Sequence, residues 1–158
     1  MDGVVVRVER KKEEEEEDTE CRRRRRQRRR VISFCLFGSR PIYVVGMLQN
    51  ARLAPKMYPG WRVVVYVGDR VARATVDALV EAGAEVRVYD ETRVRKHRAL
   101  LLRFAPLAEK GVEVVIVRDA DSRLNRREAN AVREWLAEGT AFHVMHENMH
   151  DASAILGG

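Results

Sequence analysis

From residue 31 onward, the apolar positions follow two alternating patterns. Short runs rich in Val and Ile have the length and composition of strands, and they cover 31–37, 61–67, 84–89, 112–117 and 142–145. Between them lie longer stretches with apolar residues at helical spacing, at 41–57, 71–82, 94–105 and 126–137. Strands that alternate with helices are typical of a mainly parallel sheet with helices on both faces. The pattern therefore predicts an α/β fold.

Turn and capping residues mark the ends of these elements. Pro41 suits the first turn of a helix, and Gly139 suits the position just after one. Asn125 is a good N-cap, and Glu128 three residues later resembles a capping box. Pro106 is expected to begin a further turn, because a proline does not continue a helix.

Residues 1–30 have a different character from the rest of the chain. An acidic block from Glu13 to Asp18 is followed by an Arg-rich block from Arg22 to Arg30. Blocks of like charge without an apolar period are usually disordered. We therefore predict a disordered charge-block tail over 1–30 and one domain over 31–158. Arg runs also serve as RNA-binding arms, so nucleic acid would be contacted only through the tail.

Composition narrows the class of protein only a little. The formal charge of +6 is shared equally, since residues 1–30 hold 12 Lys/Arg and 9 Asp/Glu, and residues 31–158 hold 18 and 15. The domain is thus only mildly basic. No apolar run approaches the roughly 20 residues that span a bilayer, and we see no signal peptide. We therefore expect a cytoplasmic or otherwise intracellular protein. Cys35 lies in an apolar, strand-like run and is expected to be a buried free thiol.

The segment with the clearest chemistry is Val114-Val115-Ile116-Val117-Arg118-Asp119-Ala120-Asp121. An apolar strand leads directly into two carboxylates, and α/β sheets bind ligands at the carboxyl ends of their strands. Because positions i and i+2 of a strand point the same way, Asp119 and Asp121 are expected to reach one cation together. Such a pair suits a hard divalent metal that holds a phosphate-bearing substrate.

Three interpretations of this pair compete. In a nucleotide-sugar site, the carboxylates and a diphosphate share Mn²⁺ or Mg²⁺, which neutralises the leaving group. In a phosphatase of the haloacid dehalogenase type, the first Asp is a nucleophile, but that class needs a downstream lysine and none follows Asp121. In a structural interpretation, Asp119 or Ser122 caps the next helix, and Asp121 pairs with Arg118 or Arg123.

Several further motifs accompany the carboxylate pair in a fixed order. They are Phe34-x-x-Phe37-Gly38, Pro41-x-Tyr43, Tyr58-Pro59-Gly60-Trp61, Arg103-Phe104, Arg118-Asp119-Ala120-Asp121-Ser122-Arg123, Arg127-Glu128, Trp135-Leu136, Phe142-His143-Val144-Met145 and Ile155-Leu156-Gly157-Gly158. The ordered set resembles a glycosyltransferase-like family with the GT-A (nucleotide-diphospho-sugar transferase) fold, found among capsular and viral polysaccharide enzymes. The resemblance covers residues 31–158 and implies a GT-A, Rossmann-like arrangement.

The resemblance implies a metal-dependent glycosyltransferase. Such an enzyme moves a sugar from a nucleotide-diphosphate donor to an acceptor glycan or protein, with Mn²⁺ or Mg²⁺ as cofactor. Asp119 and Asp121 match the family's Asp-x-Asp motif, in which the second Asp typically binds the metal and the first contacts ribose or metal. Many GT-A enzymes add a late histidine as a metal ligand, and His146 or His150 would fill that role.

The arginine and serine beside the carboxylates are further candidates for donor binding. Arg118, Ser122 and Arg123 flank the pair and would meet phosphate or orient the carboxylates. For the two arginines, the alternative is a salt bridge to the adjacent acids.

Three candidates come from elsewhere in the chain. Arg103 matches the family's Arg-Phe pair and is expected as a buried guanidinium near the diphosphate, with a helix-surface arginine as the alternative. Ser39 and Arg40 lie in the first loop between a strand and a helix, where backbone N–H groups favour anions. The alternative for this loop is a plain turn with a solvated arginine.

The resemblance also implies that part of the transferase is not seen here. In similar sequences the chain continues past the Leu-Gly-Gly segment, and that later part shapes the acceptor site. No residue is assigned as a general base, so the catalytic residues are unknown and the chain is expected to be the donor half, inactive if it is a fragment. The alternative is a non-catalytic, degenerate transferase domain whose Arg-rich tail contacts RNA or a protein partner.

Overall fold

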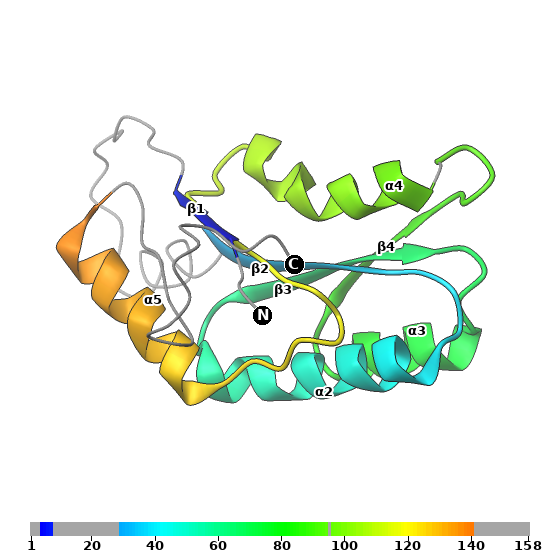
Figure 1. Ribbon diagram of the computed structural model, residues 1–158, viewed down its shortest axis with the longest axis horizontal. Helices are drawn as coiled ribbons and strands as arrows, with labels where there is room; N and C mark the ends of the chain where they lie inside the picture. Colours follow the sequence, from blue (N-terminus) through cyan, green and yellow to red (C-terminus); the bar gives the residue numbers. More distant parts are fainter. Residues whose placement is uncertain (1–3, 8–28, 95, 141–158) are drawn as a thin grey trace, which may run out of the picture.

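A five-stranded sheet forms the centre of the computed structural model, which describes residues 4–7, 29–94 and 96–140 (Figure 1). Its strands are β1 (Val4–Arg7), β2 (Arg30–Leu36), β3 (Arg62–Gly68), β4 (Glu85–Tyr89) and β5 (Val114–Val117). They lie in the order β1-β5-β2-β3-β4. Strands β5, β2, β3 and β4 are parallel, and β1 is antiparallel at the edge beside β5. The predicted α/β fold with a mainly parallel sheet is confirmed.

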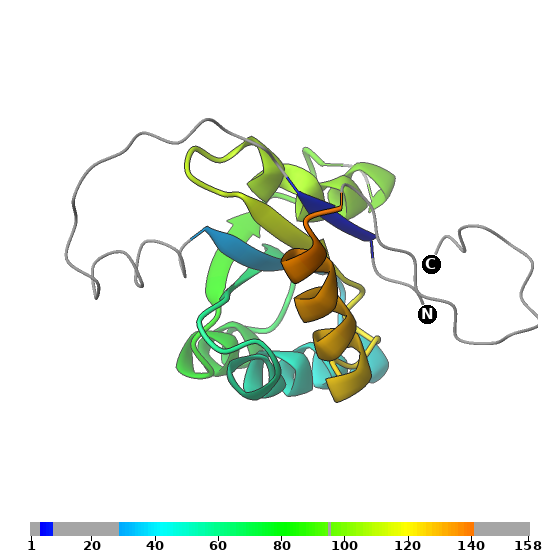
Figure 2. The same ribbon diagram turned by 90° about the vertical axis from the view of Figure 1, so that its left-hand side faces the viewer.

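Helices cover both faces of this sheet (Figure 2). Helices α2 (Pro41–Met57), α3 (Arg73–Glu81) and α5 (Arg126–Glu138) lie on one face. The short α4 (Lys96–Ala99) and the 3₁₀ helix η1 (Leu100–Ala108) lie on the other. The sheet is thus the middle of three layers.

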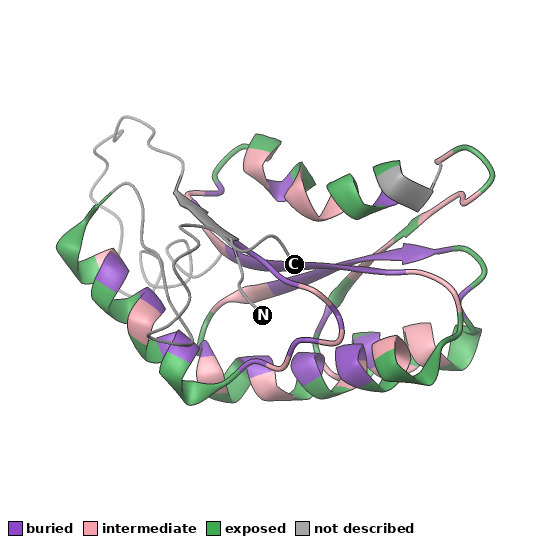
Figure 3. Ribbon diagram, in the orientation of Figure 1, coloured by how far each residue is buried: buried purple, intermediate pink, exposed green. Residues whose placement is uncertain are grey.

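Alternation along the strands supplies a core on each side of the sheet. Successive strand residues point to opposite faces, so Ile32 and Phe34 of β2 pack with α2, whereas Val31 and Cys35 pack toward η1. Both sets are buried, and Figure 3 shows the central strands buried along most of their length. Burial on both faces explains why these strands are continuous apolar runs in the sequence.

The capping residues act largely as predicted. Helix α2 begins at Pro41 and ends at Met57. The Asn125 side chain accepts a hydrogen bond from the backbone N–H of Glu128 at 2.9 Å, and Gly139 ends α5 with a φ of 72°. The predicted capping box is wrong, however, because the Glu128 carboxylate is buried beside Arg118.

The segment around Pro106 also differs from the prediction. We expected a helix over 94–105 and a new turn from Pro106. The α-helix covers only Lys96–Ala99, and the 3₁₀ helix Leu100–Ala108 runs through the proline. Pro106 has no N–H to donate toward residue 102, and its ring crowds that carbonyl, so a regular α-helix does not extend to this position.

Two short parts of the N-terminal segment lie in the sheet, and disorder of the remainder of 1–30 stays a prediction. Val4–Arg7 forms β1 and pairs with β5, and Arg30 begins β2. Residues 8–28 and the predicted strand 142–145 lie outside the described residues. Within the described ranges, no helix has the length and apolar character needed to cross a membrane.

Cys35 is a buried free thiol, as predicted. Its Sγ donates to the carbonyl of Ala99 at 3.2 Å, and burial raises the pKa of the thiol to about 11. At pH 7 only about one Cys35 thiol in ten thousand is then the reactive thiolate.

We therefore expect the Cys35 thiol to be almost unreactive in the native protein. In a Cys21→Ser variant at pH 7, where Cys35 is the remaining thiol, Ellman's reagent should react on the order of a hundredfold more slowly before unfolding in guanidinium than after it. Rapid stoichiometric labelling of the native variant would contradict this environment for Cys35.

Candidate functional site

The strand order reverses between β2 and β5. The chain places β3 and β4 on one side of β2 and then returns to place β5 on the other side. In open α/β sheets, ligands bind outside the carboxyl ends of the strands at such a reversal. Loop 37–40 follows β2, and residues 118–121 follow β5. The fold therefore brings the predicted Asp-x-Asp motif to the edge where a ligand is expected.

The two carboxylates lie on a turn rather than on the strand. Strand β5 ends at Val117, and the backbone N–H of Ser122 donates to the carbonyl of Asp119 at 3.2 Å. We call Asp119–Ser122 the carboxylate turn. Strand alternation applies only within a strand, so our argument that it aims Asp119 and Asp121 in the same direction is wrong.

The two carboxylates have different partners. Asp119 forms an ion pair with Arg103 of η1, and their side chains are 32 % and 16 % exposed. Asp121 is partly buried, and no described residue forms a hydrogen bond or an ion pair with its carboxylate. Among the described residues, Asp119 thus has a cationic partner and Asp121 has none.

Helix α2 holds the backbone of the carboxylate turn. The Asn50 side chain is fully buried, and its nitrogen donates to the carbonyls of Ala120 at 3.2 Å and Ser122 at 2.9 Å. Its oxygen accepts from the backbone N–H of Leu124 at 3.1 Å. One side chain therefore satisfies three backbone groups that have no strand partner.

Close approach of α2 makes these bonds feasible. A Cβ on Gly46, one helical turn before Asn50, would lie 2.4 Å from the carbonyl oxygen of Ala120. Sequence reasoning missed both residues. Both are poor residues for the interior of a helix. They are also one turn apart, so they share a face of the predicted helix. This pairing was the signal in the sequence for a close contact on that face.

A buried ion pair fastens the turn to α5. The Arg118 side chain is 6 % exposed, its Nη2 donates to Ser122 Oγ at 2.7 Å, and the same nitrogen lies 3.2 Å from Glu128 Oε2. Burial raises the pKa of Glu128, and the charge of Arg118 opposes that shift. Arg118 and Ser122 are therefore turned inward, which fits the second of the two roles we predicted for them, orientation of the carboxylates.

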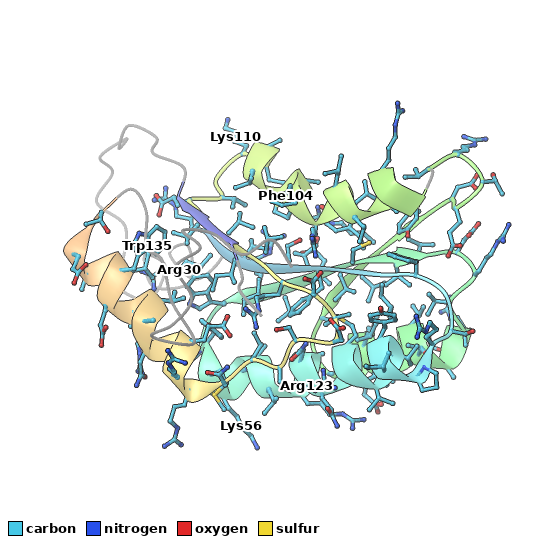
Figure 4. The ribbon with its side chains drawn as sticks, viewed as in Figure 1. Arg30, Lys56, Phe104, Lys110, Arg123 and Trp135 are labelled. Atoms are coloured by element: carbon cyan, nitrogen blue, oxygen red, sulfur yellow. The ribbon has the colours of Figure 1, made fainter. Side chains whose placement is uncertain are left out.

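The remaining predicted residues lie around the turn. Nε of Arg123 donates to the Gln49 side chain of α2 at 2.6 Å, and Figure 4 shows Arg123 beside that helix. Ser39 and Arg40 are exposed before the first turn of α2, and no hydrogen bond or ion pair among the described residues joins them to the carboxylate turn.

The metal set is only partly visible. His146 and His150 lie outside the described residues, as does His143. Within residues 4–7, 29–94 and 96–140, no group of three or more His, Cys, Asp or Glu side chains is placed to hold a metal. Comparison of the sequence with protein-family models and with curated proteins gave no match. A proposal for ligand binding at this edge therefore has to be argued from the carboxylate turn and the described residues around it.

Asn50 provides a first test of how the turn is held. Asn50→Ala should lower the free energy of unfolding by about 3 kcal/mol, because it leaves buried backbone groups without partners. Gln49→Ala is the matched control, since that exposed side chain bonds only Arg123 among the described residues, and should cost less than about 0.5 kcal/mol. Urea titration followed by tryptophan fluorescence measures both, and equal losses would contradict the role of Asn50.

The buried Arg118–Glu128 pair predicts strong energetic coupling. Removal of one partner leaves a buried charge uncompensated, so Arg118→Met and Glu128→Leu should each cost about 3–5 kcal/mol. The double variant should lose at least about 2 kcal/mol less than the sum of the single losses. Additive losses in a double-mutant cycle of unfolding free energies would show that the two side chains act independently.

Proposed function

We propose that this chain binds the donor of a metal-dependent glycosyltransferase that uses a nucleotide-diphosphate sugar. The observation that carries the proposal is the position of the carboxylate turn at the carboxyl end of β5, where the strand order reverses. That position favours a phosphate-bearing ligand, and the carboxylates favour a hard cation as its companion.

The residues of the turn fit Mn²⁺ or Mg²⁺. Mg²⁺ is usually bound through one or two carboxylates, with waters and substrate phosphates completing the shell, so a group of three protein ligands is not required. Asp121 would hold the metal, and Asp119 would join it or contact the ribose. When bound, the metal would neutralise the charge that develops on the leaving diphosphate.

The protein's own contribution is positioning. Asn50 and the Arg118–Glu128 pair hold the turn before the ligand arrives, which lowers the cost of ordering it on binding. Arg103 supplies a guanidinium, whose planar donors match phosphate oxygens. At the N-terminus of α2, Pro41 has no N–H and the N–H groups of Tyr43 and Val44 donate to the carbonyl of Arg40, so this end would attract an anion chiefly through the positive end of the helix dipole.

Transfer to an acceptor glycan or protein is proposed on the resemblance of the motifs alone. The described residues support binding of the donor, and we assign no general base among them. The first experiment therefore measures binding rather than turnover.

We expect Mn²⁺-dependent binding of a nucleoside diphosphate. Titration calorimetry of the full chain with UDP, GDP, ADP and CDP should find at least one that binds at least tenfold more tightly with Mn²⁺ than with EDTA. Asp121→Ala should abolish that difference, because it removes the carboxylate left free for the metal. Asp77→Ala removes an exposed carboxylate on α3 that pairs with Arg73, and should change nothing.

Two outcomes would redirect the proposal. If Asp121→Ala binds Mn²⁺ and nucleotide as the parent does, the metal site is elsewhere. If no nucleotide binds but RNA does, with a steep salt dependence that disappears when Arg22–Arg26 are replaced by Gln, the chain is a binding protein that acts through its tail. These replacements keep the connection between β1 and β2 at its full length.

A further inference from the structure

Arg103 is held by one carboxylate. Its guanidinium pairs with Asp119, and this is its one polar partner among the described residues. Its Nε is buried without a hydrogen-bond partner. The central carbon of the guanidinium lies 5.8 Å from the ring centre of Phe104, which Figure 4 shows on the η1 side of the sheet. Among the described residues, the Asp119 carboxylate is therefore the group that neutralises the charge of Arg103.

Two other arginines among the described residues, one partly buried and one buried, are held by several groups. Arg87 bonds to Glu85, Glu109 and the hydroxyl of Tyr66. Arg118 bonds to Ser122 and pairs with Glu128. Arg29 is likewise held by one carboxylate among the described residues, that of Glu113, but its side chain is 35 % exposed against 16 % for Arg103. Arg103 is the more buried of the two and keeps a buried Nε without a hydrogen-bond partner, so its single carboxylate partner needs a separate explanation.

Arg103 and a metal ion compete for Asp119. A divalent cation on Asp119 would face the guanidinium charge, which does not deprotonate in proteins. A metal that arrives alone must therefore displace Arg103 and leave its charge without a partner. A metal that arrives with a diphosphate brings phosphate oxygens, to which a guanidinium forms charge-assisted and often bidentate hydrogen bonds.

We propose that Arg103 is an exchange residue that pairs with Asp119 in the unliganded protein and moves to the donor diphosphate when metal and diphosphate bind together. Metal binding then depends on the diphosphate, and by linkage diphosphate binding depends on the metal to the same degree. This inference rests on the proposed function for the identity of the two ligands. It adds that Arg103 makes their binding cooperative and disfavours a metal without donor.

The test is a metal titration with and without a diphosphate. Free Mn²⁺ is followed by electron paramagnetic resonance in the presence of the full chain, first with Mn²⁺ alone and then with saturating inorganic pyrophosphate. Arg103→Gln should bind Mn²⁺ alone about tenfold more tightly than the parent, which corresponds to about 1.4 kcal/mol. The factor by which pyrophosphate strengthens Mn²⁺ binding should fall at least tenfold in the same variant.

Two further variants separate exchange from a general change of charge. Arg98→Gln removes an exposed arginine five positions earlier in the chain and should leave the affinity for Mn²⁺ alone unchanged. Arg103→Lys keeps the charge but not the guanidinium fork, so it should give an intermediate affinity. If circular dichroism shows that Arg103→Gln does not fold, Arg103→Lys serves as the test. An Arg103→Lys variant that binds Mn²⁺ alone with the affinity of the parent would then overturn the proposal.

The remaining outcomes distinguish the two proposals. In the first outcome, pyrophosphate strongly increases Mn²⁺ binding to the parent, but Arg103→Gln binds Mn²⁺ alone no more tightly than the parent does. This result overturns the exchange role and leaves the donor site intact. In the second outcome, Asp121→Ala binds Mn²⁺, with and without pyrophosphate, as tightly as the parent does. This result overturns the donor site itself and the exchange role with it.

Discussion

The three hydrogen bonds of Asn50 are the constraint on which the candidate site depends. The backbone N–H of Arg118 makes a last hydrogen bond to β2, at the carbonyl of Ser33, and the chain then leaves the sheet until α5 begins at Arg126. Asn50 supplies partners for Ala120, Ser122 and Leu124 from within the neighbouring helix. Buried backbone groups must be paired, so without this residue the segment would have to rearrange or take up water. The direction of the carboxylates follows from that restraint.

Charge is distributed unequally around the turn, and this distribution suggests separate tasks. Arg118 and Glu128 are buried together, and such a pair is costly to break even where it adds little net stability. Arg103 is less buried and is tied to the motif by one carboxylate. The pair behind the turn supports its backbone, whereas the guanidinium beside it has one carboxylate partner among the described residues.

The two faces of the sheet contribute different parts of this arrangement. Helix α2 approaches the turn closely at Gly46 and fixes its backbone. From the opposite face, the 3₁₀ helix η1 supplies Arg103. That segment is wound as a 3₁₀ helix from Leu100 to Ala108, and Arg103 lies within it. The site is therefore assembled across the sheet edge by α2, 70 residues from the turn at the Asn50–Ala120 contact, and by η1, 16 residues from it at the Arg103–Asp119 pair.

The sequence by itself determined the α/β class, the order of the elements, the limits of α2 and α5, the buried Cys35 and the place of Asp119 and Asp121 just beyond a strand. These features are local, because they depend on hydrophobic period, proline and glycine positions and helix capping. Only the tertiary structure decided that β1 covers the edge of β5, that Arg118 turns inward to Glu128, that Arg103 pairs with Asp119, and that Asn50 holds the turn. Two of these join segments far apart in the chain, and the other two join different elements only 10 and 16 residues apart. In all four, hydrophobic periodicity carries no information about which backbone or polar groups will meet.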